Sequence, residues 1–271
     1  MVFRYREGFR DLPTVVPCGQ CLGCRLDWAG DWAARCEKEA KLHEANSFIT
    51  LTYNDESLPI SIDPRGTVVK RDFQLFMKRL RKQHGDKIRF FASGEYGDLN
   101  QRPHYHAILF GCAFDDLVPW KGGRFPLYTS NKLATLWGQG FVTVGGVSYQ
   151  SSSYVARYVL KKLRGLAEVS AYTQREAPFI LMSRRPGIGS AWFDQFHTDV
   201  YPDGRLHVGE GKIRRAPRYF DDKFKVLDPK AHLKMKAKRK AYAKANASLP
   251  VQLYTKQEIT KSRLNLLSRP L

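Results

Sequence analysis

The chain has 271 residues, of which 43% are hydrophobic, so it is long enough to bury a substantial core. It carries 45 lysine and arginine residues against 26 acidic ones, and the formal net charge of +19 points to a polyanionic partner such as nucleic acid. No run approaches about 18 apolar residues, and the start MVFRYREGFRD lacks the pattern of a signal peptide, so a membrane-spanning or secreted protein is not expected.

The first predicted element is a helix over residues 22–45, and cysteines lie before it and within it. The pattern C-x2-C-x2-C-x11-C is formed by Cys18, Cys21, Cys24 and Cys36. In a chain without secretory features, this close spacing favours thiolate ligands for a metal over disulfides. We expect a structural zinc site made by these four cysteines, or by three of them with His43 in place of Cys36. The alternatives are an iron–sulfur cluster and a set of buried thiols.

Downstream of this helix, apolar periodicity predicts a sheet with a packed helix. Strands are expected over 47–53, 88–93, 104–110 and 141–147. Phe73, Phe76 and Leu80 recur at the spacing of one helical face, which predicts a helix over 71–84. These elements predict an α+β fold, with a central antiparallel sheet of about five strands, helices packed on one face and a metal site on the other. The N-terminal cysteine-rich helical segment adds to this sheet.

A candidate metal site lies in the segment RFFASGEYGDLNQRPHYHAILF at 89–110. His104 and His106 are two apart in a predicted strand, so both side chains project to one face. If the preceding strand pairs with theirs, the glycine-containing connection carries Glu95 back beside them. Two imidazoles and one carboxylate suit Mg²⁺, Mn²⁺ or Zn²⁺ and leave coordination positions open for a substrate. The alternative is a histidine pair on a solvated strand face.

Two tyrosines follow at helical spacing. A serine of the run SSS is expected to cap a helix over 154–162. Tyr154 and Tyr158 are four apart, so their phenols share one helix face, with Lys161 about one turn further along. A phenol attacks phosphate only when a metal polarises the target and a positive group steadies the phenolate, so we predict these three residues to be catalytic. The alternative is an amphipathic core stripe.

Basic residues beyond this helix indicate DNA contacts. Lys162, Arg184 and Arg185 are expected to bind backbone phosphates. Residues 212–240 hold twelve Lys or Arg against three Asp, a local charge of +9, which predicts a sequence-independent and salt-sensitive grip on DNA. A basic helix is expected over 229–246.

The chain is expected to divide into three parts. Residues 1–46 form the cysteine-rich segment and its helix, 47–190 a catalytic domain, and 191–271 a basic C-terminal extension. No G-x4-G-K-[ST] phosphate loop occurs, so unwinding of duplex DNA is expected to depend on a separate helicase of the host.

Seven segments together carry a resemblance to a known family. They are PCGQCLGCR (17–25), FITLTYNDESLP (48–59), FQLFMKRLRK (73–82), FFASGEYG (90–97), RPHYHAILFG (102–111), YVARYVLKK (154–162) and MSRRPGIG (182–189). In these segments the chain resembles the HUH endonucleases, and specifically the rolling-circle replication initiators of gokushovirus-type microviruses. The resemblance implies Glu95, His104 and His106 as ligands of Mg²⁺ or Mn²⁺, and Tyr154 and Tyr158 as the nucleophile pair.

The resemblance also implies an activity. Such an enzyme nicks one strand of circular viral DNA at the origin, keeps the end as a 5′-phosphotyrosine, and later rejoins the ends. Its partners would be single-stranded or supercoiled viral origin DNA, a host helicase and a host DNA polymerase, in the cytoplasm of the host bacterium. Two other classes stay open: a noncatalytic zinc-containing DNA-binding protein, and a metal-dependent nuclease in which water attacks.

Overall fold

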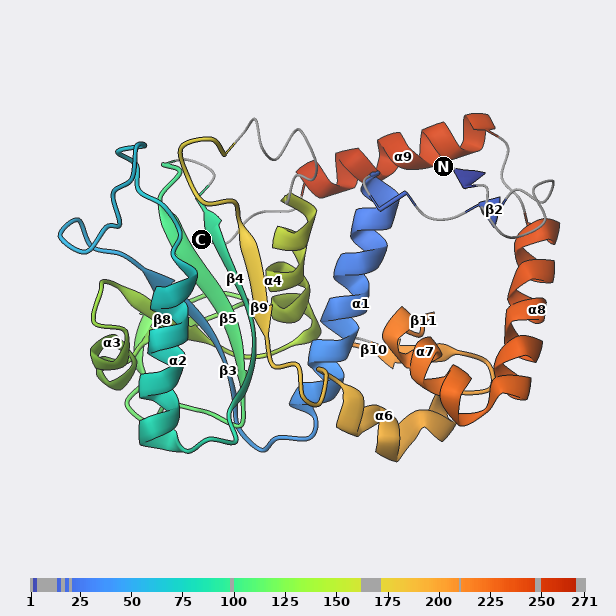
Figure 1. Ribbon diagram of the computed structural model, residues 1–271, viewed down its shortest axis with the longest axis horizontal. Coiled ribbons are helices and arrows are strands. Elements are labelled where there is room, and N and C mark those ends of the chain that lie inside the picture. Colours follow the sequence, from blue (N-terminus) through green and yellow to red (C-terminus); the bar gives the residue numbers. More distant parts are fainter. Residues whose placement is uncertain are drawn as a thin grey trace.

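A seven-stranded antiparallel sheet, with strand order β6-β7-β8-β3-β5-β4-β9, forms the largest element of the protein (Figure 1). The structure is a computed structural model, and it describes residues 2–3, 14–15, 18–19, 21–97, 100–161, 172–209, 211–246 and 250–266. Helices pack against the sheet, so the predicted α+β class with an antiparallel sheet is confirmed. The sheet has more strands than expected.

The strands of the large sheet are β3 (Asn46–Thr52), β4 (Arg89–Tyr96), β5 (Pro103–Phe110), β6 (Val118–Lys121), β7 (Leu127–Thr129), β8 (Val142–Gly145) and β9 (Phe179–Met182). The four predicted strands correspond to β3, β4, β5 and β8, and the other three were not predicted. Two small antiparallel pairs lie outside this sheet: β1 (Val2–Phe3) with β2 (Thr14–Val15), and β10 (Arg205–Val208) with β11 (Lys212–Arg215).

The helices are α1 (Leu22–Ala40), α2 (Lys70–His84), α3 (Asn131–Trp137), α4 (Tyr149–Lys161), α6 (Ser190–Phe196), α7 (Arg218–Leu227), α8 (Pro229–Ala245) and α9 (Pro250–Asn265). A short 3-10 helix, His197–Asp199, follows α6. The predicted helices over 71–84 and 229–246 are confirmed as α2 and α8. Among the described residues, no helix combines the length and the apolar character needed to cross a bilayer.

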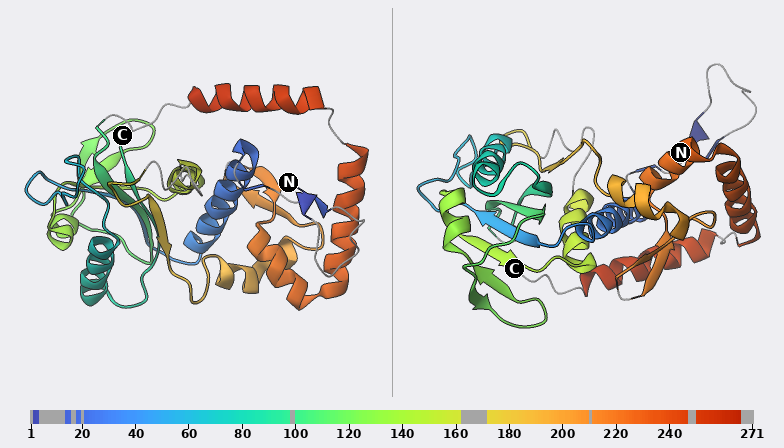
Figure 2. Two further views of the ribbon diagram at one scale, coloured as in Figure 1. Left: turned by 45° about the horizontal axis from the view of Figure 1, so that its top comes forward. Right: turned by 90° about the horizontal axis from the view of Figure 1, so that it is seen from below.

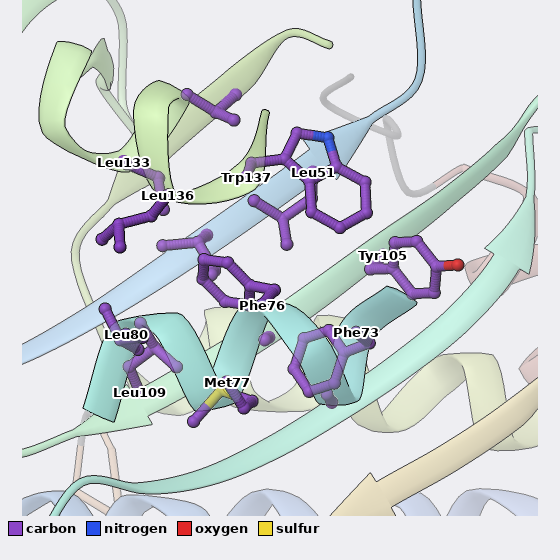
Figure 3. Packing of buried hydrophobic residues seen from close by; sticks show 14 of the residues in the cluster. Leu51, Phe73, Phe76, Met77, Leu80, Tyr105, Leu109, Leu133, Leu136 and Trp137 are labelled. Carbon is purple, nitrogen blue, oxygen red and sulfur yellow. The ribbon is translucent and has the colours of Figure 1, made fainter. Parts of the chain in front are cut away.

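One face of the sheet packs against α2 and α3. Odd-numbered residues of β3 and β5, such as Leu51 and Tyr105, meet Phe73 and Phe76 of α2 and Trp137 at the end of α3 (Figure 3). All five side chains are almost fully buried. This is the apolar face that the spacing along α2 predicts, and it makes the sheet a rigid support for the opposite face.

The opposite face is covered by α1 and α4. Phe48, Phe91 and Ile108 of the sheet pack there against Cys36 of α1 and Val155 of α4. Helices therefore cover both faces, whereas they were expected on one. The sequence pattern explains the difference, because both alternating sets of residues in β5 are buried, and a strand buried on both sides needs cover on both sides.

Helix α4 begins five residues earlier than predicted, at Tyr149. Ser148 and Ser151 exchange hydrogen bonds: the Ser148 hydroxyl accepts from the Ser151 backbone N–H at 3.1 Å, and the Ser151 hydroxyl accepts from the Ser148 N–H at 2.7 Å. This reciprocal pair is the arrangement of a capping box. The expected caps, Ser152 and Ser153, lie inside the helix instead.

A third cluster of buried residues joins the C-terminal elements to α1. It includes Phe193, Phe220 and Phe224, packed with Ala34 of α1. The Lys38 ammonium, in α1, donates a 2.6 Å hydrogen bond to the backbone carbonyl of His207. Figure 2 shows α6, α7 and the β10–β11 hairpin grouped beside α1, on the side away from the sheet. Helix α1 therefore packs on the sheet with one side and on the C-terminal elements with another.

Candidate metal and tyrosine site

Glu95 lies within β4, directly opposite His104 of β5. The expectation that a connecting loop carries it back was therefore wrong, because β4 continues through Gly94 to Tyr96. A side chain at Gly94 would meet the ring of Phe179 at 2.6 Å, so the glycine leaves room for β9 to pair with β4. Strand pairing therefore places the carboxylate beside the imidazoles.

The three side chains converge on one point. The Nε2 atoms of His104 and His106 lie 3.0 and 3.2 Å from the same oxygen, Oε1 of Glu95. All three residues are buried, and their ligand atoms lie within 4.8 Å of one another. Burial of both rings rules out the alternative of a histidine pair on a solvated strand face.

Backbone and hydroxyl groups orient the two rings. Nδ1 of His104 lies 3.0 Å from the carbonyl oxygen of Arg102, which can only accept, so Nδ1 donates and Nε2 keeps its lone pair. Nδ1 of His106 lies 2.9 Å from the Thr50 hydroxyl, which can accept in the same way. Both Nε2 atoms then present lone pairs to Glu95, and this is the tautomer of histidine metal ligands.

The charge state of Glu95 fits the same use. Burial alone would favour the neutral acid, but the hydrogen bonds of His104 and His106 outweigh it, and the pKa of Glu95 is lowered. Its second oxygen, Oε2, is buried and has no hydrogen-bond partner among the described residues. A buried carboxylate facing two imidazole lone pairs is a donor set that suits a divalent cation, and its residues fit Mg²⁺ or Mn²⁺.

Tyr154 is the predicted nucleophile that the structure brings to this centre. Its ring stands edge-on to the His106 ring, with centroids 5.2 Å apart, and also meets the Phe48 ring at 6.1 Å. Phe48 in turn stacks on His106. The phenol therefore comes from the helix that covers the ligand face of the sheet, while Val155 beside it fills the core.

The other predicted catalytic residues are placed by backbone alone. Tyr158 and Lys161 lie on α4, and four residues of helix put Tyr158 about 6 Å beyond Tyr154 along the axis. Their side chains lie outside the described part of the structure, and Lys162 lies outside it altogether.

The predicted phosphate-binding arginines sit elsewhere. Arg184 and Arg185 are exposed in the turn after β9. The preceding residue, Ser183, donates its backbone N–H to the carbonyl of Phe90, which lies five residues, or about 17 Å, from Glu95 along β4. The structure thus places these arginines at the far end of β4 from the metal ligands.

Three of the four predicted zinc ligands come together at the start of α1. The sulfur atoms of Cys18, Cys21 and Cys24 lie within 4.8 Å of one another, and those of Cys18 and Cys24 are 3.9 Å apart. Cys36 is not among them. It is twelve residues further along the same helix, about 18 Å away, and burial in the core raises the pKa of its thiol. His43, the other expected ligand, instead lies 3.5 Å from Glu39.

Sequence reasoning missed the two groups that hold the imidazoles. The carbonyl of Arg102 leaves no sequence signal, because any residue supplies one. Thr50 did carry a signal: Phe48, Thr50 and Thr52 alternate with Ile49 and Leu51, so polar groups line the face that holds the histidines.

Comparison with known proteins agrees with this site. Residues 46–163 match the model of a family of replication-associated proteins, described by its ORF2 members. The match contains the metal-ligand strands and the tyrosine helix. No solved protein structure matches the chain.

Curated relatives cover more of the chain. It is 32% identical to replication-associated protein VP4 of Bdellovibrio phage phiMH2K, over 92% of this chain and 80% of that protein. It is 36% identical to replication-associated protein ORF2 of Spiroplasma virus 4, over 76% and 66%, and 37% identical to replication-associated protein ORF4 of Chlamydia phage 1, over 78% and 54%. The chain therefore belongs to the family of replication-associated proteins of gokushovirus-type microviruses.

Proposed function

We propose that this protein is a replication initiator that nicks one strand of circular viral DNA at its origin and later rejoins the ends. The observation that carries the proposal is the contact of Tyr154 with His106, beside Glu95 and His104. A metal-ligand set next to a phenol is what covalent phosphoryl transfer to tyrosine requires. The names of the relatives support a role in phage replication.

The ligand set prepares the target. Glu95, His104 and His106 would hold Mg²⁺ or Mn²⁺, and the bound cation would polarise the scissile phosphodiester. Thr50 and the carbonyl of Arg102 fix the rings in advance, so the donor set needs no rearrangement.

The chemistry is a transesterification. The phenol oxygen of Tyr154 or Tyr158 attacks the phosphorus in line, a bond forms between that oxygen and phosphorus, and the bond from phosphorus to the 3′-oxygen breaks. The proton lost by the phenol balances the proton gained by the 3′-hydroxyl. The number of phosphoester bonds is unchanged, so no nucleotide cofactor is needed, and the 3′-hydroxyl can prime synthesis.

A second tyrosine on the same helix would serve the joining step. One phenol keeps the first DNA end while the other cuts the newly made origin, and the two ends are then joined as a circle. Lys161, on the same helix, is proposed to steady the phenolate.

The remaining assignments belong to this proposal. Cys18, Cys21 and Cys24 would hold a structural Zn²⁺ at the start of α1, with a fourth ligand other than Cys36. The partners would be viral origin DNA, a host helicase and a host DNA polymerase, in the cytoplasm of the host bacterium. The basic stretch at 212–240 and the turn of Arg184 and Arg185 would bind DNA phosphates.

A gel assay tests the proposal against its two competitors. The protein is incubated with Mn²⁺ and the single-stranded circle of its own virus, and then denatured. Tyrosine transfer gives DNA that migrates with covalently bound protein, hydrolysis by water gives free 5′-phosphate ends, and a noncatalytic binder leaves the circle intact. Either of the last two results would refute the proposal.

Matched variants assign the nucleophiles. The adduct should persist when Tyr154→Phe or Tyr158→Phe is made alone and disappear when both are made. Tyr149→Phe, at the first residue of the same helix, is the control and should leave the adduct unchanged. An adduct that survives the double substitution would show that another residue attacks.

A further inference from the structure

The row of the sheet that carries the metal ligands continues toward an exposed aromatic pair. Glu95 pairs with His104, and His104 pairs with Thr52 on β3. Both the backbone N–H and the hydroxyl of Thr52 donate to the carbonyl of Phe141, at 2.9 and 2.8 Å. Phe141 thus lies two strands, or about 10 Å, from His104.

Phe141 shares the face of the metal ligands. Thr50 pairs with Thr143 on β8, and Thr50 holds His106, so Thr143 points to that face. Phe141 is two residues before Thr143 in extended backbone and therefore points the same way. No helix in the described part of the chain covers it: 46% of its surface is exposed. The ligand face is hence closed by α1 and α4 on one side and open toward β8.

A second aromatic ring completes the exposed surface. Trp120, in β6, is 50% exposed, and its ring centroid lies 5.1 Å from that of Phe141 at an angle of 58°. Phe125, at the tip of the same β6–β7 hairpin, is 47% exposed. Large aromatic side chains gathered on a surface, with their flat faces open, indicate a binding site.

The charge around these rings selects the partner. The hairpin carries Lys121 and Arg124, and the Arg124 guanidinium lies 5.5 Å from the centre of the Phe125 ring. The nearby carboxylates are already paired: Asp115 with the Lys132 ammonium at 2.6 Å, and Asp116 with the Ser130 hydroxyl. Exposed aromatic faces interleaved with cations are the recognition chemistry of single-stranded nucleic acid, whose bases stack and whose phosphates are anionic.

We propose that Trp120 and Phe141 form a stacking platform for unpaired bases next to the scissile phosphate. The platform would bind the strand without reading its sequence, because every base offers a flat face. It would also require the duplex to be opened at the nick site, since paired bases cannot reach the rings. This inference rests on the proposed function, because it takes the phosphate at Glu95, His104 and His106 as the fixed point of the strand.

The test measures binding alone, without Mn²⁺ and without cleavage. Fluorescence anisotropy gives the affinity for oligothymidylate of about 20 nucleotides, a length that spans the site of an aromatic single-strand binder. Trp120→Ala combined with Phe141→Ala should weaken binding by about 5-fold to 100-fold per stacked base. Trp120→Phe combined with Phe141→Tyr keeps both rings and should stay near the wild-type affinity.

Two controls separate stacking from charge and from loss of fold. Phe196→Ala removes an exposed aromatic ring from α6 and should leave affinity unchanged. An abasic oligonucleotide of equal length and charge should bind wild type and the double alanine variant equally. Thermal melting checks that the variants are folded.

Equal affinity of the wild type and the double alanine variant for oligothymidylate, whether tight or weak, would overturn the platform. So would an equal loss on abasic DNA. Because no bond is cut in this assay, the platform can fail while nicking stands, and nicking can fail while the platform stands.

Discussion

Thr50→Val tests whether the orientation of His106 is built into the sheet. Valine has almost the shape of threonine, so the substitution removes the hydroxyl 2.9 Å from Nδ1 of His106 and little else. A buried polar atom that loses its partner costs about 1–3 kcal/mol, which corresponds to about 5-fold to 150-fold in an equilibrium constant. Loss of a partner that orients a histidine ligand costs about 10-fold to 100-fold in metal affinity. We therefore expect the affinity for Mn²⁺ to fall by about 10-fold to 100-fold.

Isothermal titration of the DNA-free protein with Mn²⁺ measures this loss. The matched control is Thr143→Val, the same change at the buried residue that pairs with Thr50 on β8. It should change the affinity by less than about threefold, because no imidazole depends on it. If both variants bind Mn²⁺ as the wild type does, the hydroxyl of Thr50 does not orient the ligand and the reasoning is refuted.

Three further predictions follow from other parts of the structure. After metal is removed, iodoacetamide at pH 8 should label Cys18, Cys21 and Cys24 but not Cys36 or Cys112, because burial raises the pKa of both buried thiols, to about 11 for Cys112; peptide mass spectrometry reads the sites, and Zn²⁺ that failed to protect the first three would contradict a zinc site. Gly140→Ala should destabilise the fold by about 1–3 kcal/mol in urea unfolding, because Gly140 has φ +151° and an added Cβ would lie 2.4 Å from the Thr52 carbonyl oxygen; Gly122→Ala, in open space, is the control, and equal stability of the two would count against this account. Replacing the exposed Lys236, Lys238 and Lys240 of α8 by Gln should reduce the slope of log affinity against log salt for single-stranded DNA by about 2, and an unchanged slope would show that α8 does not touch the backbone.

Local patterns predicted the helices and the inner strands well, because their signals are local. Helix α2 has its apolar residues at helical spacing, and β5 alternates between two buried sets. The convergence of His104 and His106 followed directly from strand geometry. Glu95 was expected in a loop because glycines flank it, but Gly94 is a strand residue that makes room for the ring of Phe179.

Features that depend on distant contacts were not predicted. The strand β9 pairs with β4 across more than eighty residues of sequence, and no local pattern announces such a partner. Cys36 matched a metal-ligand spacing only when counted along the sequence. Once residues 22–40 are a helix, its distance from Cys24 follows from the helical rise, so the sequence could have excluded it.

Helix α1 has a consequence for how this protein can be divided. Its buried side chains serve two cores, and Asp31 and Lys38 bind Arg214 and the His207 carbonyl of the C-terminal part. A fragment cut at residues 47 and 190 would lose the helix against which α4 rests, and with it the support for Tyr154. Expression of a minimal enzyme should therefore start upstream of Leu22, and removing the C-terminal part would strip the partners from one side of the helix that backs the nucleophile.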